Sequence, residues 1–164
     1  MVDARVKAYG TAALIFALDW ATKRMIEARV SFFDTFKVIP GFFDIVRSEN
    51  RGVAFGIFNG QGPEWRTTLL VVASLVAVVV ISVILWGAKR LDRYSLWGFA
   101  LILGGAAGNV SDRMLHGRVT DFLLLYAGDY QWPAFNVADS AIVIGSGLLI
   151  LDMLRNRKQA ANVS

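Results

Sequence analysis

The chain has 164 residues, enough for one domain, and 55% of them are hydrophobic whereas only 18% are charged. A soluble domain of this size needs more charge to cover its surface, so the composition excludes an ordinary soluble protein and indicates an integral membrane protein. The absence of cysteine excludes disulfides, a thiol nucleophile and a thiolate metal site, and the net charge of +4 fits basic loops on anionic lipid better than nucleic-acid binding.

Four apolar stretches predict four transmembrane helices in one integral-membrane domain, 1–164. They cover about residues 8–26, 67–87, 94–112 and 135–154. The second stretch is the clearest, since it carries no charge. In the first, Asp19 and Lys23 are spaced i, i+4, which places them on one helix face where they can pair. The alternative for this segment is a signal peptide with Lys7 as its basic region, but no small-x-small cleavage site follows.

The distribution of basic residues predicts the orientation. The two termini and the loop near 89–93 carry eight Lys and Arg in short segments, whereas the other two loops carry the remaining nine over a longer stretch. The higher density predicts that both termini are cytoplasmic. The third and fourth spans would then bring their polar ends together at the extracytoplasmic face.

The first outer loop, at about 30–62, is too long for a turn and is expected to be a β-rich extracytoplasmic insertion. The strings FKVI, FFDIV and VAFGIF predict strands, separated by turns at PG and ENRG. A small antiparallel sheet in this loop would place aromatic side chains against lipid or over the site: Phe32, Phe33, Phe42 and Phe43. The second outer loop, Leu123–Pro133, is expected to form a short amphipathic piece or a lid.

Two aspartates lie where a membrane helix normally has none. Asp121 follows the third apolar span and Asp139 lies near the start of the fourth. An ionised carboxylate near the bilayer core costs roughly 2.5–3.5 kcal/mol on insertion scales, so such residues are paired, hydrated or functional. A salt bridge from Arg118 would explain Asp121 alone, but not both. Two converging carboxylates can share one proton and activate water, which predicts a membrane-embedded aspartic peptidase.

Further polar residues lie at the same predicted edge of the membrane. The structural interpretation is a hydrogen-bonded network that joins the helix ends, because lipid offers no partners. It is favoured for two local opposite-charge sets, Asp19 with Lys23 and Asp112 with Arg113.

Two asparagines, Asn109 and Asn136, are expected to orient the aspartates by hydrogen bonds, and Arg113 to hold a neighbouring backbone carbonyl. His116 is expected on a polar loop and not as a metal ligand, since no second histidine exists to complete a zinc set. The glycines of GGAAG, at 104–108, are expected to permit close helix packing.

Five motifs, in this order, resemble the lipoprotein signal peptidases, also called signal peptidase II. They are DWATK (Asp19–Lys23), ENRGVAFG (Glu49–Gly56), GGAAGNVSDR (Gly104–Arg113), VTDF (Val119–Phe122) and FNVADS (Phe135–Ser140). The resemblance covers nearly the whole chain. Arg51 and Val53 stand where the family often has smaller residues, a departure that touches no catalytic position.

The resemblance implies a four-span aspartic peptidase of the bacterial inner membrane. It would cleave prolipoproteins just before a cysteine that already carries a diacylglyceryl group. Carried over, the catalytic residues are Asp121 and Asp139, and the supporting set is Asp19, Lys23, Asn50, Gly52, Asn109, Asp112, Arg113 and Asn136. The expected partners are diacylglyceryl prolipoproteins, membrane lipid and globomycin-type inhibitors. No metal or other cofactor is needed, no nucleic acid is involved, and a single chain would complete the site.

Two other functions remain open from the residues. In the first, Lys23 serves as the base for a serine nucleophile, with Ser111 or Ser140 as candidates. In the second, the chain is a small proton-coupled transporter that uses Asp139 as its relay.

Overall fold

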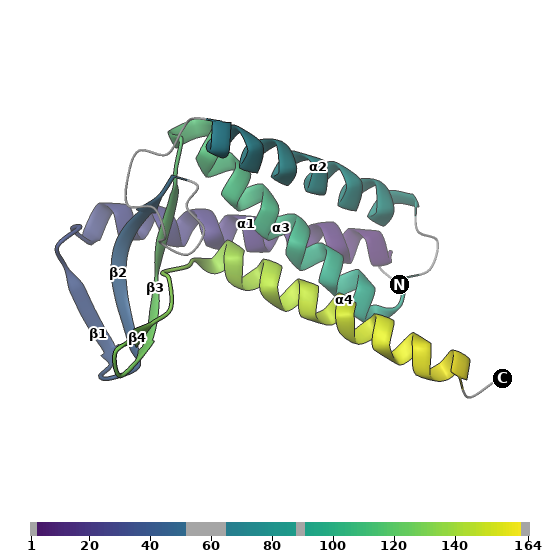
Figure 1. Ribbon diagram of the computed structural model, residues 1–164. Coiled ribbons are helices and arrows are strands. Elements are labelled where there is room, and N and C mark those ends of the chain that lie inside the picture. The colour runs from purple at the N-terminus through teal and green to yellow at the C-terminus, as the bar shows by residue number, and fades with distance from the viewer. Residues whose placement is uncertain (1–2, 52–64, 88–90, 162–164) are drawn as a thin grey trace.

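The computed structural model describes residues 3–51, 65–87 and 91–161. Within these ranges the chain is mostly helical and has one small antiparallel sheet region at one end of the helices (Figure 1). The elements in chain order are α1 (Ala4–Arg29), β1 (Thr35–Ile39), β2 (Phe43–Asn50), α2 (Trp65–Gly87), α3 (Arg93–His116), β3 (Val119–Ala127), β4 (Tyr130–Gln131) and α4 (Val137–Ala161). Both ends of the chain lie away from the sheet (Figure 1).

Helix α3 is the central element, since it packs against α1, α2 and α4. Its N-terminus is capped by Asp92, whose side chain accepts the backbone N–H of Tyr94. It ends at His116 and is capped by Gly117, which adopts the left-handed conformation with φ 67° and donates its N–H to the carbonyl of Arg113. This tight ending lets β3 begin at Val119, so Asp121 follows closely after the end of α3.

The sheet has the strand order β1-β2-β3-β4. The predicted strands FKVI and FFDIV correspond to β1 and β2. Strand β2 continues through Glu49 and Asn50, the first two residues of the ENRG string where a turn was predicted, and the last residue of that string lies outside the described residues. The third predicted strand, VAFGIF, lies outside the described residues. The prediction of a sheet made by the first loop alone was incomplete: β3 and β4 come from the second loop, where we expected an amphipathic piece or lid.

The pairing of β2 with β3 determines the position of the strand that carries Asp121. Ser48 lies opposite Asp121 and Glu49 lies opposite Thr120. A one-residue slip of this register would turn Asp121 to the other face of the sheet, because strand side chains alternate. The long-range pairing therefore determines where the Asp121 carboxyl points.

Two helices of the described chain are long and apolar enough to cross a membrane. They contain Thr68–Gly87, with a mean hydropathy of 3.0, and Val137–Asn156, with a mean hydropathy of 1.8. Helix α2 leaves many apolar side chains exposed, among them Val76, Val79 and Val83, as expected for a lipid-facing surface.

Glycines allow α3 to approach its neighbours closely, as the GGAAG pattern predicted. A Cβ on Gly104 would lie 2.6 Å from the carbonyl oxygen of Ala12 in α1, and one on Gly105 would overlap the carbonyl oxygen of Ala138 in α4. Backbone atoms cannot move aside as a flexible side chain can. These contacts therefore set the spacing of α1, α3 and α4 beneath the sheet.

We expect the Gly105→Ala variant to be destabilised by about 1–3 kcal/mol, because the added methyl group must push α3 and α4 apart. Gly10→Ala is the matched control, since a Cβ on Gly10 meets nothing within 4 Å and alanine favours a helix. Thermal unfolding in detergent measures both. Equal unfolding temperatures for the two variants would contradict this account of the packing.

Candidate active site

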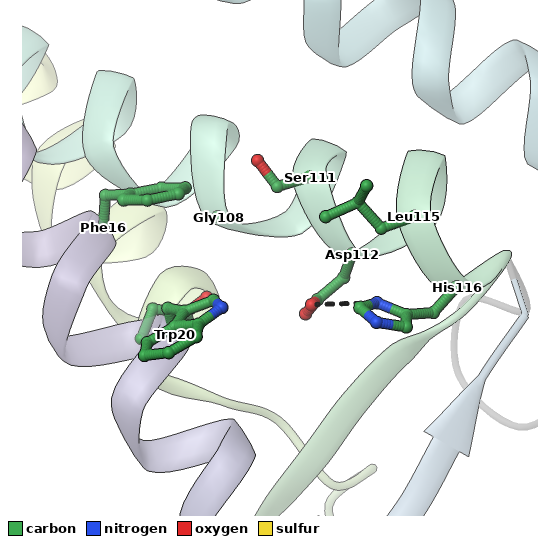
Figure 2. A pocket seen from close by; sticks show the side chains of 8 residues that line it. Phe16, Trp20, Gly108, Ser111, Asp112, Leu115 and His116 are labelled. Carbon is green, nitrogen blue, oxygen red and sulfur yellow. Dashed lines mark ion pairs between the residues drawn. The ribbon is translucent and has the colours of Figure 1, made fainter.

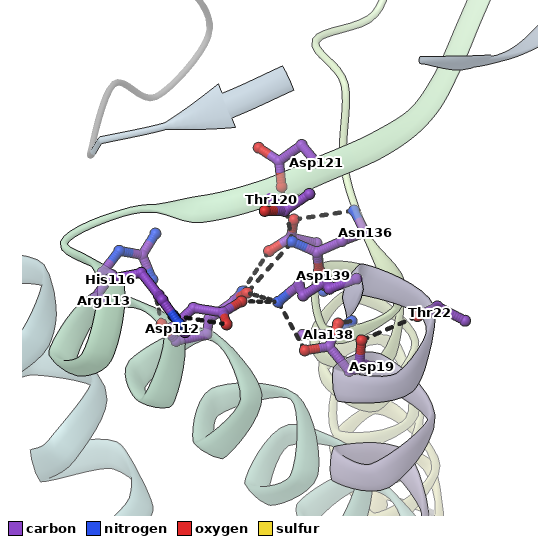
Figure 3. Close-up of polar contacts among 12 residues, drawn as sticks. Asp19, Thr22, Asp112, Arg113, His116, Thr120, Asp121, Asn136, Ala138 and Asp139 are labelled. Carbon is purple, nitrogen blue, oxygen red and sulfur yellow. Dashed lines mark hydrogen bonds and ion pairs between the residues drawn. The ribbon is translucent and has the colours of Figure 1, made fainter. Parts of the chain in front are cut away.

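The candidate site lies where β3, the first turn of α4, α3 and the C-terminal half of α1 meet (Figure 3). Asp121, in β3, is only 3% exposed. Asp139 lies in the first turn of α4 and is half-buried. The structure thus brings the two predicted aspartates to one place from different elements.

Asn136 links the two aspartates directly. It precedes α4, and its side-chain oxygen accepts the backbone N–H of Asp139 at 2.9 Å, while the Asp139 carboxylate accepts the backbone N–H of Asn136 at 3.3 Å. This reciprocal pattern is a capping box. The amide nitrogen of Asn136 then donates to Oδ1 of Asp121 at 2.7 Å. One side chain thus begins α4 and also holds the carboxyl of Asp121.

Asn109 holds the other carboxylate. Its amide nitrogen donates to Oδ1 of Asp139 at 2.7 Å, and its oxygen accepts from Nζ of Lys23 at 3.0 Å. An ammonium group can only donate, so Lys23 fixes which end of the amide faces Asp139. Both asparagines therefore orient the aspartates, as the sequence predicted.

Lys23 is 0% exposed and is surrounded by acceptors. Besides Asn109, its ammonium contacts Asp19 at 2.7 Å and Asp112 at 2.8 Å. The predicted pairing of Asp19 with Lys23 is confirmed. Asp19 also accepts the backbone N–H of Ala138, near the start of α4, at 2.9 Å. This charge cluster joins α1, α3 and α4.

The structural interpretation of the opposite-charge set of Asp112 and Arg113 holds for Asp112, but through other partners. Asp112 pairs instead with Lys23 and, at 3.0 Å, with Arg24, since neighbouring residues on a helix point in different directions. Arg113 donates to the backbone oxygen of Asn109 at 3.4 Å, as predicted, and its charge interacts with both Asp121 and Asp139.

The alternative of a salt bridge between Arg118 and Asp121 is wrong, because Arg118 pairs with Glu49 at 3.1 Å. Asn50, in β2, hydrogen-bonds the Asp121 side chain, as expected of a supporting residue. The remaining member of the predicted set, Gly52, lies outside the described residues.

A separate cavity of about 150 Å³ lies between α1 and α3 (Figure 2). It is lined by Phe16, Asp19, Trp20, Gly108, Ser111, Asp112, Leu115 and His116. His116 is the last residue of α3 and faces Asp112 at 3.8 Å, so the prediction of a loop position was wrong. Among the described lining residues, neither Asp121 nor Asp139 occurs, so this cavity is not where the two carboxylates meet.

Burial and charge give Asp121 an unusual protonation equilibrium. Removal from water, followed by the neighbouring charge of Asp139, raises the pKa of Asp121 from its ordinary value of 3.8 to about 7. Hydrogen bonds from Asn50 and Asn136, and the charge of Lys23, oppose the rise. Asp121 can therefore keep its proton near neutral pH beside a second carboxyl group, an arrangement that suits acid–base chemistry on water.

The raised pKa of Asp121 predicts that its ionisation destabilises the fold. The folded state holds this proton more tightly than the unfolded state, so this stability contribution is full below pH 3.8 and is lost as pH rises through about 7. Asp121→Asn stays neutral, so its unfolding temperature should exceed that of the wild type by a margin that widens from pH 5 to pH 8. The expected margin is about 2–4 °C per kcal/mol of relieved penalty. A margin independent of pH would contradict the raised pKa.

Comparisons with known proteins agree with this site. The family model described as signal peptidase (SPase) II matches residues 11–155. The chain is 66% identical, over the full length of both, to a protein of Solibacter usitatus named lipoprotein signal peptidase. It is 44% identical to the protein of that name from Nitratidesulfovibrio vulgaris, over 89% of this chain and 88% of the relative.

A solved structure, described as a bacterial membrane enzyme studied by the in meso method at 2.3 Å resolution, superposes with a TM-score of 0.81. It is 28% identical and covers 93% of this chain and 90% of its own. The chain therefore belongs to the signal peptidase II family and is a membrane peptidase.

Proposed function

We propose that this peptidase removes the signal peptide from diacylglyceryl-modified prolipoproteins, cleaving just before the lipidated cysteine by an aspartic mechanism. The observation that carries the mechanism is the bridge in which Asn136 binds both Asp121 and Asp139. The substrate class is supported by the relatives' name, lipoprotein signal peptidase. A lipidated substrate also suits a site that opens where water meets lipid.

In the proposed reaction Asp139 is the base and Asp121 is the acid. Asp139 lies in the first turn of α4, where it accepts a hydrogen bond from the amide of Asn109 and lies near the charge of Arg113. Asp139 takes a proton from water, and the hydroxide equivalent attacks the scissile carbonyl carbon. Protonated Asp121 donates its proton to the carbonyl oxygen, which gives a tetrahedral gem-diol. The proton held by Asp139 then passes to the leaving nitrogen as the C–N bond breaks, and a hydroxyl proton of the gem-diol returns to Asp121 as the new carboxylic acid forms.

The proposal includes four spans, at about 8–26, 67–87, 94–112 and 135–154, with cytoplasmic termini in a bacterial inner membrane. The hydropathy of α2 and α4 supports two of these crossings. The sheet and the aspartates would then lie toward the extracytoplasmic face, where the exposed side chain of Phe33 (96%) suits a lipid boundary. We propose that the enzyme acts as a monomer. Globomycin-type inhibitors would compete for this site.

The serine mechanism is disfavoured by the contacts of Lys23. Three acceptors, on Asp19, Asp112 and Asn109, surround its ammonium group and match its three N–H groups, and neither candidate serine is among them. The hydroxyl of Ser140 donates to the backbone oxygen of Asn136, and Ser111 lines the separate cavity. The transporter hypothesis is not retained, because the family is one of peptidases.

Cleavage of a diacylglyceryl-modified prolipoprotein in detergent, followed by gel shift, tests the proposed roles. We expect Asp121→Asn and Asp139→Asn each to lose at least about 100-fold in rate, since each removes one acid–base partner. Ser111→Ala and Ser140→Ala are the matched controls and should keep most of the activity. Cleavage that survives either aspartate substitution would contradict the aspartic mechanism.

The pH profile of the wild type gives a second test. Because Asp121 must be protonated and its pKa is about 7, kcat/KM should fall as pH rises through about 7. The profile is measured with the same substrate under single-turnover conditions. A rate that stays constant from pH 6 to pH 9 would show that no group with this pKa acts as the acid.

A further inference from the structure

A hydrogen bond outside the predicted site set ties the strand that carries Asp121 to helix α1. Thr120 precedes Asp121 in β3 and is only 2% exposed, and its hydroxyl donates to Oε1 of Glu27 at 2.5 Å. Successive side chains of a strand point to opposite faces, so the Thr120 side chain lies on the face opposite to that of Asp121. The bond therefore anchors the strand from behind the carboxyl.

Glu27 is itself held on both sides. Its second carboxylate oxygen pairs with Arg24 at 2.6 Å, and Arg24 pairs in turn with Asp112 of α3 at 3.0 Å. The backbone oxygen of Glu27 accepts from Nη1 of Arg47 in β2 at 2.9 Å. Glu27 is therefore a fixed anchor and not a mobile surface side chain.

These contacts complete a second connection between the two aspartates. The first runs through Asn136. The second starts at Thr120 and passes in order through Glu27, Arg24, Asp112, Lys23 and Asn109 to Asp139. Strand β3 is thus held relative to α4 at two points, one on each side of the strand.

We propose that Thr120 and Glu27 are positioning residues. Their hydrogen bond sets how close β3 lies to helix α1, and hence the separation of the Asp121 and Asp139 carboxyls. This inference rests on the proposed function. Neither residue contacts the reacting atoms. Two carboxyls share a proton only when they are close and poorly hydrated, so an outward shift of the strand would weaken their coupling.

The charged groups around Asp121 give the direction of the effect. They are Asp139 of α4, Arg113 of α3 and Lys23 of α1. Glu27 lies behind Thr120, and the charged neighbours on β2, Arg47 and Glu49, pair with each other at 3.6 Å. If the strand moved outward, Asp121 would gain water and feel less of the Asp139 charge. Both changes lower the pKa of Asp121.

The test is the pH dependence of prolipoprotein cleavage by Thr120→Val, with Thr120→Ser as the matched variant. Valine keeps the shape and strand preference of threonine but removes the donor, whereas serine keeps the donor. We expect Thr120→Val to lose up to about 100-fold in kcat with little change in KM. We also expect its upper pH limb, which is the fall in rate as pH rises, to move to lower pH. Thr120→Ser should keep the wild-type pH limb.

Glu27→Met, alone and combined with Thr120→Val, shows whether the two residues act through one bond. The single variant should move the limb in the same direction, and the double variant should move it no further. If Thr120→Val does not fold, Glu27→Met alone decides. A wild-type pH limb in the folded variant, even with reduced thermal stability, would overturn the positioning role. Failure of the wild type to cleave would instead overturn the proposed function.

Discussion

The burial of one ammonium group, that of Lys23, is the interaction on which the rest of the site depends. A buried charge is tolerated only when it is paired and its hydrogen bonds are satisfied, and Lys23 meets this requirement through Asp19, Asp112 and Asn109. Its partners come from α1 and α3, and Asp19 also accepts the backbone N–H of Ala138, near the start of α4. Loss of the cation would leave two buried carboxylates near each other, so the three helices must keep this arrangement.

The rest of the site follows from that cluster together with the close packing of α3. The Asp19 carboxylate occupies the space beside Gly108 in α3. A Cβ on Gly108 would lie 2.5 Å from Oδ2 of Asp19. Lys23 then fixes the amide of Asn109, and the start of α4 fixes the amide of Asn136. Each amide presents N–H to one aspartate. The helices therefore supply prearranged donors, and the sheet brings Asp121 to them.

Features set by local spacing could be predicted from the sequence, whereas features set by distant contacts could not. The i, i+4 spacing predicts the pair of Asp19 and Lys23, and an aspartate within an apolar helix identifies Asp139 as unusual. Strand β3 escaped prediction because most of its length pairs with β2, whose partner residues lie 69 to 82 positions earlier in the chain. The bond between Thr120 and Glu27 joins residues 93 positions apart, and no local pattern signals it. Asp112 forms its ion pairs with Lys23 and Arg24 and not with the adjacent Arg113, because neighbouring residues on a helix point in different directions.

The proposed mechanism requires Asp121 and Asp139 to hold one proton between them near neutral pH. Infrared difference spectroscopy of the purified protein in detergent, recorded across pH 5 to 9, detects the carbonyl stretch of a protonated carboxyl directly. We expect a band that disappears near pH 7 in the wild type and is missing in Asp121→Asn. A spectrum in which no carboxyl titrates between pH 5 and pH 9, or a band unchanged in Asp121→Asn, would contradict the shared proton.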